Sequence, residues 1–132
     1  MSQENVDRAR EFLDAYNRRD FDAAFALCDP EVDFVLPARQ SSDSGRGTEE
    51  ISRFWEGLDE TMEELTLEQR EFFDGGDRVA TRLRYFGRGR ESGVEVETEM
   101  YHQVITFSDG RMVRIEYFGS WPEALKAAGG SE

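Results

Sequence analysis

The sequence predicts an α+β fold in which a curved, mixed or antiparallel sheet wraps around three N-terminal helices. Two observations lead to this expectation. The first half of the chain contains three stretches with apolar residues at helical spacing, interrupted by one short strand. From Leu65 onward, apolar residues alternate at period two between turn signals, which is typical of four strands in a meander. The 132 residues are expected to form one domain.

The helices are predicted from capping residues and proline. Ser2 is expected to cap the first helix, Asp20 a short second helix, and Thr48 a third. Asp29-Pro30 should end the second helix, because the residue before proline avoids the α conformation. Trp121-Pro122 is expected to begin a short C-terminal helix.

The stretch from Tyr101 to Gly119 is the clearest strand signal, because two alternating runs flank the turn dipeptide Asp109-Gly110. On the second run, Glu116 is predicted to share a face with Arg114 and Phe118. A glutamate on so apolar a strand either faces solvent or points into a pocket. In a pocket, burial would raise its pKa and prepare it for acid–base chemistry.

Composition and charge exclude several classes of function. A formal net charge of −13 opposes binding to nucleic acid or to anionic lipid surfaces. No apolar run approaches the roughly 20 residues of a membrane span, so a cytoplasmic protein is expected. The single cysteine, Cys28, is expected to be a buried and unreactive thiol. Histidine and carboxylate residues lack metal-ligand spacing, and neither a metal nor another cofactor is predicted.

The polar residues of the hairpin are predicted to line a largely apolar pocket for a small hydrophobic molecule. Glu116 is expected to act as acid or base and to lie within hydrogen-bonding distance of Tyr101, with Tyr101 and Gln103 binding the substrate oxygen or the carboxylate. His102 should lie on the opposite face of the sheet from Gln103. The residues expected to form the rest of the pocket are Tyr16, Trp55, Phe118 and Arg114.

Three segments carry a resemblance to a known family: DAYNRRDFDAAFALCDPEVDF, GRGTEEISRFW and FSDGRMVRIEYF. In order and spacing they resemble the nuclear transport factor 2-like superfamily, and within it the SnoaL-like group. The resemblance covers nearly the whole chain. It implies a cystatin-like, ketosteroid isomerase-like cone with a pocket between sheet and helices, often in a homodimer. Members include isomerases, hydrolases, dehydratases, polyketide cyclases and binding modules, so the fold does not fix the activity.

Two comparisons within that superfamily narrow the chemistry. The positions that resemble the catalytic base, tyrosine and aspartic acid of ketosteroid isomerase are Leu36, Phe12 and Gln103. All three groups are replaced, which argues against that reaction and makes Leu36 and Phe12 expected pocket walls. In the resemblance to limonene-epoxide hydrolase, Glu116 matches one acid, but Tyr101 and Gln103 stand where the other charged groups would be.

The sequence therefore favours a SnoaL-like protein that binds a small hydrophobic molecule. Whether it is an enzyme stays open; if it is one, proton-transfer chemistry of the isomerase, cyclase or dehydratase type is expected. Two alternatives stay open: a non-catalytic binding or dimerisation module, and an enzyme similar to epoxide hydrolase. A homodimer is expected, because an exposed apolar face would not remain bare on a soluble monomer. The residues assigned to that face are Val104, Val113, Ile115 and Tyr117.

Overall fold

The computed structural model describes residues 2–35 and 45–129, and only the backbone of residues 2, 85 and 97–101. The helices in this part of the chain are α1 (Ser2–Asn17), α2 (Phe21–Ala26), α3 (Thr48–Thr61) and α4 (Trp121–Ala127). The strands are β1 (Cys28–Val35), β2 (Gly45–Arg46), β3 (Met62–Asp74), β4 (Arg78–Gly89), β5 (Glu95–Ser108) and β6 (Arg111–Phe118).

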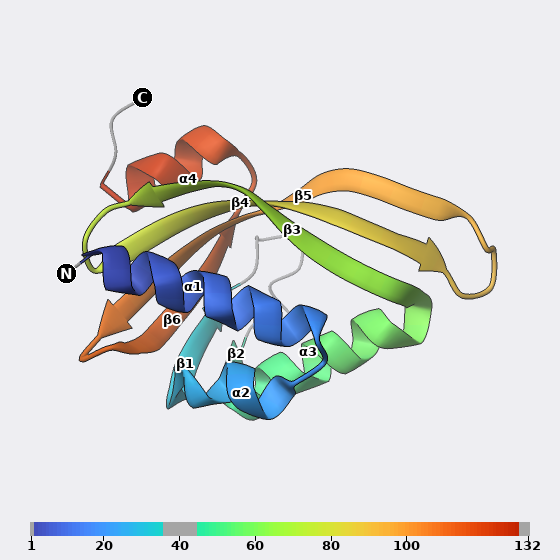
Figure 1. Ribbon diagram of the computed structural model, residues 1–132, viewed down its shortest axis with the longest axis horizontal. Helices are drawn as coiled ribbons and strands as arrows, with labels where there is room; N and C mark the ends of the chain where they lie inside the picture. Colours follow the sequence, from blue (N-terminus) through green and yellow to red (C-terminus); the bar gives the residue numbers. More distant parts are fainter. Residues whose placement is uncertain (1, 36–44, 130–132) are drawn as a thin grey trace.

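The strands form one curved sheet in the order β2-β1-β6-β5-β4-β3 (Figure 1). The last four strands of the chain pair with their sequence neighbours as an antiparallel meander, and β1 joins β6 in parallel. Helices α1, α2 and α3 pack against the concave face, and α4 packs against the convex face. The predicted α+β class, with a curved sheet around N-terminal helices, is confirmed.

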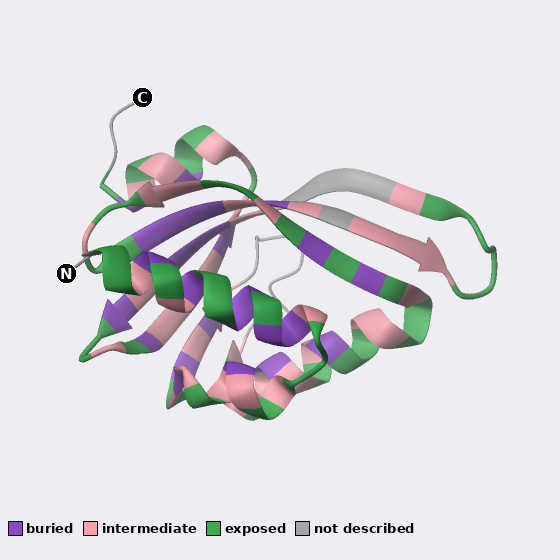
Figure 2. Cartoon of the chain, in the orientation of Figure 1, coloured by how far each residue is buried: buried purple, intermediate pink, exposed green. Residues whose placement is uncertain are grey.

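The main core lies between the concave face and the first three helices. Period-two alternation sends Val79, Thr81 and Leu83 of β4 inward, and each is fully buried. Helix α1 contributes one apolar face and exposes the other to solvent (Figure 2). Among the described residues, no helix is long and apolar enough to cross a membrane.

The predicted caps are partly confirmed. The side chain of Asp20 accepts a hydrogen bond from the Ala23 backbone nitrogen at 3.2 Å, which caps α2. The expectation for Thr48 is wrong: Gly47 occupies the N-cap of α3 at φ +96°, a conformation that favours glycine.

Asp29-Pro30 does not end α2, because the helix stops at Ala26 and the dipeptide lies inside β1. It falls where the register of β1 against β6 shifts, which leaves room for a residue without an N–H.

The convex face is not the apolar surface that the sequence predicted. Ile115 and Tyr117 are buried in the core on the concave side. Val104 does lie on the convex side, but it packs in a small cluster with Ala124 and Ala128 from the region of α4. The apolar-surface argument for a homodimer is therefore wrong, and the homodimer itself stays a prediction.

The C-terminus of α3 is held by the turn between β4 and β5. The last carbonyl groups of a helix have no partner within the helix. Arg90 supplies two donors here: its Nε donates to the Asp59 carbonyl at 2.5 Å, and its backbone nitrogen donates to the Thr61 carbonyl at 3.0 Å. Its guanidinium also lies 3.7 Å from Glu63. One side chain therefore joins α3, β3 and the turn between β4 and β5.

We expect Arg90→Ala to lower the free energy of unfolding by about 1–2 kcal/mol, because a helix carbonyl loses a charged donor. Arg53→Ala is the matched control, since Arg53 lies on α3 and its ion pair among the described residues is the exposed i,i+3 pair with Glu50. It should cost less than about 0.5 kcal/mol. Urea unfolding followed by circular dichroism measures both, and equal losses would contradict the capping role.

Candidate functional site

A pair of polar side chains lies inside the core between the sheet and the helices. Gln103 of β5 and Tyr117 of β6 are register partners, and Gln103 Nε2 donates to the Tyr117 hydroxyl at 2.8 Å. Gln103 is 3% exposed and Tyr117 is 9% exposed. Burying polar groups is unfavourable unless they are hydrogen-bonded, so this pair requires a structural or functional reason.

Two more hydroxyl groups belong to the same interior. Thr81 of β4 is the register partner of Gln103 on its other side and is fully buried. Its hydroxyl has no hydrogen-bond partner among the described residues. Tyr16 of α1 is also buried and acts electrostatically on Tyr117. Thr81, Gln103 and Tyr117 thus form a polar row across three neighbouring strands, with Tyr16 contributed by the helix layer.

Aromatic side chains surround this polar row. Trp55 of α3 is the centre of one group, with its ring centroid 4.8 Å from that of Tyr16 and 5.6 Å from that of Phe12. Phe34 of β1 joins the row directly, because its ring meets that of Tyr117 edge to face at 5.6 Å. The environment is therefore apolar, with a small number of polar groups that converge, as in many small-molecule sites.

The described polar groups of this interior are neutral. Burial raises the pKa of the Tyr117 phenol well above its ordinary value, the hydrogen bond from Gln103 lowers it in part, and Tyr16 raises it further. The buried thiol of Cys28 behaves similarly, with burial and nearby Asp29 raising its pKa to about 12. At neutral pH, Tyr117 is a protonated phenol. It is suited to hydrogen bonding with an oxygen rather than to removing a proton.

Four of the predicted site residues lie together in this core: Tyr16, Trp55, Phe12 and Gln103. His102 lies on the convex side of the sheet, opposite to Gln103, as the sequence predicted. It pairs in register with Phe118, and its ring centroid lies 6.5 Å from that of Trp121. The catalytic and binding roles assigned to these residues stay predictions.

The predicted placement of Glu116, Arg114 and Phe118 in the pocket is wrong. Phe118 packs against the cluster beneath α4 on the convex face. Glu116 accepts a hydrogen bond from Arg114 Nε at 3.2 Å, and Arg114 lies 3.8 Å from Asp33. Glu116 therefore belongs to a half-exposed ion-pair network outside the core.

Glu116 and Arg114 lie outside the pocket because the hairpin contains a β-bulge. The register begins as the two-residue turn predicts, with Phe107 opposite Met112. The next pair is Thr106 opposite Arg114, so Val113 is an extra residue in β6. A shift of one residue exchanges the two faces of a strand. Beyond the bulge, Gln103 therefore faces Tyr117, and Glu116 faces Val104.

Some predicted positions cannot be compared with the structure. Leu36 lies outside the described residues. Tyr101 is described only by its backbone, which pairs with Leu83 of β4. Its expected hydrogen bond with Glu116 therefore rests on sequence alone, although the register pairs Glu116 with Val104.

Sequence reasoning missed Tyr117 and Thr81. The alternating pattern assigns Tyr117 to the opposite face, because the bulge at Val113 leaves no clear signal in it. Thr81 could have been found: it alternates with Ala80 and Arg82 and so shares a face with Val79 and Leu83. Among the described residues, no group of three or more potential metal ligands is present.

Comparison with known proteins agrees with this architecture. The family model described as the SnoaL-like domain matches residues 9–115. No curated protein matches the chain. A solved NTF2-like protein of unknown function from Burkholderia pseudomallei is 23% identical, with 93% of this chain and 95% of that chain covered and a TM-score of 0.78.

Two further solved structures are similar over nearly their whole length. TerC, co-crystallised with polyporic acid, is 19% identical, with 96% of this chain and 99% of TerC covered and a TM-score of 0.76. A proposed SnoaL-like polyketide cyclase from Jannaschia sp. CCS1 is 19% identical, with 98% and 94% covered and a TM-score of 0.77. At these identities the likeness shows the fold alone. Since the family model covers most of the chain, the protein belongs to the SnoaL-like domain family, and its fold is that of the NTF2-like protein.

Proposed function

We propose that the protein binds a small, largely apolar molecule between the concave face of the sheet and helices α1–α3. The Gln103–Tyr117 pair would hold an oxygen atom of that molecule. The observation that carries the proposal is the 2.8 Å hydrogen bond between these two buried side chains, set among aromatic rings. A purely structural core would be expected to place apolar residues there, because buried polar groups add little net stability. The small-molecule complex of TerC supports the same use of the fold.

If the protein is an enzyme, the same pair supports proton-transfer chemistry of the isomerase, cyclase or dehydratase type. Such reactions develop negative charge on a substrate oxygen, and fixed neutral donors in an apolar site stabilise that charge. Tyr117 would be the donor, and Gln103 would orient its hydroxyl. Tyr101 remains a proposed participant, because it lies two residues before Gln103 on β5. Glu116 no longer has this role, because it lies on the convex face.

The alternative of a non-catalytic binding module uses the same residues without turnover. Absence of turnover with a bound ligand would favour it, and absence of binding would contradict both proposals. An activity like that of epoxide hydrolase is less well supported. The one acid that matched its site, Glu116, pairs with Arg114 outside the core.

We expect Tyr117→Phe and Gln103→Leu each to weaken binding about tenfold, because each removes one hydrogen-bonding group from the site. Polyporic acid is a suitable first probe, followed by a panel of aromatic ketones and phenols, with affinity measured by calorimetry. Glu116→Gln is the control and should bind as the wild type does. Loss of binding in Glu116→Gln with full binding in Tyr117→Phe would reverse the assignment.

Thr81 offers a separate test of function against stability. Thr81→Val keeps the shape of the side chain and removes a buried hydroxyl without a partner among the described residues. We expect the free energy of unfolding to rise by up to about 1 kcal/mol and the affinity for the ligand to fall.

Thr81→Ser is the matched control, since it keeps the hydroxyl and loses a methyl group. It should be less stable by about 1 kcal/mol and keep its affinity. If Thr81→Val is more stable and binds as well as the wild type, the Thr81 hydroxyl has no part in the site.

The neutral interior also predicts a pH dependence. In the unfolded chain the Cys28 thiol ionises near its ordinary pKa of 9.0, whereas in the folded protein its pKa is about 12. The pKa of Tyr117 is likewise raised from 10.0. Between these values the unfolded chain releases protons that the folded protein retains. The free energy of unfolding should therefore be at its full value below pH 9 and fall as pH rises toward 12.

Urea unfolding from about pH 8 to about pH 11 would measure this decline. Cys28→Ala should make the decline shallower from pH 9 upward, and Tyr117→Phe should do so from pH 10 upward. Parallel curves for the wild type and both variants would show that neither group is protected from ionisation in the fold.

A further inference from the structure

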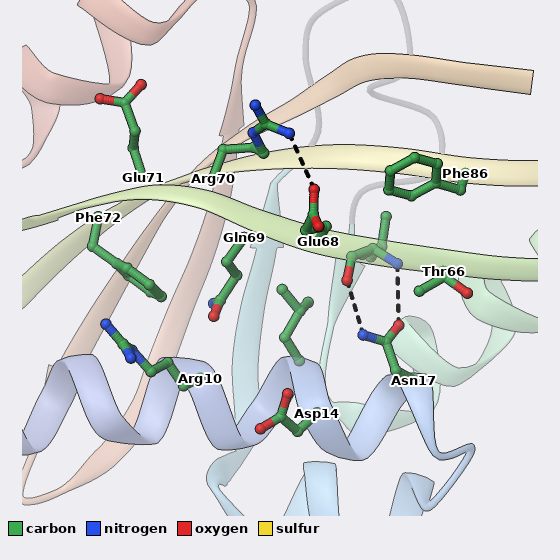
Figure 3. A pocket seen from close by; sticks show the side chains of 12 residues that line it. Arg10, Asp14, Asn17, Thr66, Glu68, Gln69, Arg70, Glu71, Phe72 and Phe86 are labelled. Atoms are coloured by element: carbon green, nitrogen blue, oxygen red, sulfur yellow. Dashed lines mark hydrogen bonds and ion pairs between the residues drawn. The ribbon is translucent and has the colours of Figure 1, made fainter.

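A groove of about 850 Å³ runs beside β3, which is the edge strand of the sheet (Figure 3). Residues 66–72 of β3 form one wall, and the face of α1 that carries Arg10, Asp14 and Asn17 forms the other. An edge strand presents backbone N–H and C=O groups that can pair with a strand of another chain. The groove provides room for such a strand.

The irregularities of β3 divide its regular pairing with β4 into short stretches. The register against β4 shifts between Glu63 and Thr66 and again between Gln69 and Glu71. Glu64, inside the first irregularity, has a positive φ of 58°. Bulges of this kind twist an edge away from pairing. Between the two irregularities, pairing with β4 is regular from Thr66 to Gln69, and it is regular again from Glu71 to Asp74.

Asn17, at the end of α1, and Arg19, in the turn after it, bond to the backbone of β3 at Leu67 and Leu65. Asn17 Nδ2 donates to the Leu67 carbonyl at 2.8 Å, and the Leu67 backbone nitrogen donates to Asn17 Oδ1 at 3.1 Å (Figure 3). Arg19 Nη2 donates to the Leu65 carbonyl at 2.9 Å. The amide of Asn17 thus offers Leu67 the same donor and acceptor that a residue of a neighbouring strand would offer.

We propose that Asn17 and Arg19 form an edge guard, which occupies the backbone groups of β3 at the place where another strand would pair. The strand that the unguarded edge would take is the same segment of a second copy, in antiparallel orientation. In a pairing centred on Leu67, Thr66 faces Glu68 of the second copy, so no like charges are opposed from Thr66 to Gln69. The short length of the stretch from Thr66 to Gln69 makes the pairing weak and dependent on concentration. This inference is independent of the proposed ligand site.

The test compares Asn17→Ala with Asn5→Ala by sedimentation equilibrium at increasing protein concentration. Asn5 is a matched control: it lies on α1 and its Nδ2 donates at 2.9 Å to the Gly76 carbonyl, in the turn after β3. We expect the average mass of Asn17→Ala to rise above that of the wild type with concentration, toward twice that mass. Asn5→Ala should follow the wild type. An unchanged mass in folded Asn17→Ala, or an equal rise in both variants, would overturn the proposal.

A second substitution tests the proposed occupant. Thr66 is exposed and its side chain donates only to the Glu64 carbonyl among the described contacts. In the background of Asn17→Ala, Thr66→Glu would oppose Glu68 of the second copy, and the mass should return to that of the wild type. Persistent association in this double variant would exclude self-pairing at this register.

Amide hydrogen exchange at Leu67 provides a readout that a general loss of stability would not give. In dilute Asn17→Ala, this amide should exchange at least about tenfold faster than in the wild type, because its acceptor is gone. At high concentration it should become protected again. Protection as in the wild type under dilute conditions would show that Asn17 does not guard the edge. Asn17→Asp, which keeps the acceptor and loses the donor, should be intermediate and serves if Asn17→Ala does not fold.

Discussion

One extra residue in β6 decides which side chains enter the core. Without the bulge at Val113, the turn at Asp109-Gly110 would place Glu116 beside Gln103 among the aromatic rings. An ionised carboxylate in that environment is strongly unfavourable, and a protonated one would need its own partners. With the bulge, Tyr117 takes the inner position and Glu116 reaches Arg114 on the convex face. The same shift thus makes the interior neutral and creates an ion-pair network outside it.

The neutral interior explains why polar groups are tolerated at the centre of the core. Gln103 and Tyr117 satisfy each other in part, which lowers the penalty of burying them. Thr81, next to Gln103, has no such partner among the described residues. An unsatisfied hydroxyl in a row of hydrogen-bonding groups is better explained by a ligand than by packing, because valine would fill the same space at lower free energy. Threonine at position 81 lowers the stability of the core, and the proposed binding site gives a reason for its presence.

The parts of the fold that depend on local sequence could be predicted. Helical spacing, the Asp20 cap and the Asp109-Gly110 turn act over a few residues, and they indicate the order of the main elements and the α+β class. Period-two alternation correctly places Gln103 on the concave side and His102 on the convex side. Strand register across a bulge depends on packing between distant segments, so alternation assigns Glu116 and Tyr117 to the wrong faces. The prediction for Asp29-Pro30 is wrong for a similar reason, since its place in β1 depends on pairing with β6.

Helix α1 connects the ligand site with the edge of the sheet. Its inner face contributes Phe12 and Tyr16 to the aromatic core, and the next residue, Asn17, bonds to β3. Arg19 continues this contact from the turn after the helix: its guanidinium lies 4.8 Å from the Tyr16 ring and bonds to the Leu65 carbonyl. The position of Tyr16 is thus fixed both by packing and by backbone bonds to an edge strand. Because β3 pairs with another strand on one side only, these contacts help to fix its other edge against the helix that carries Tyr16.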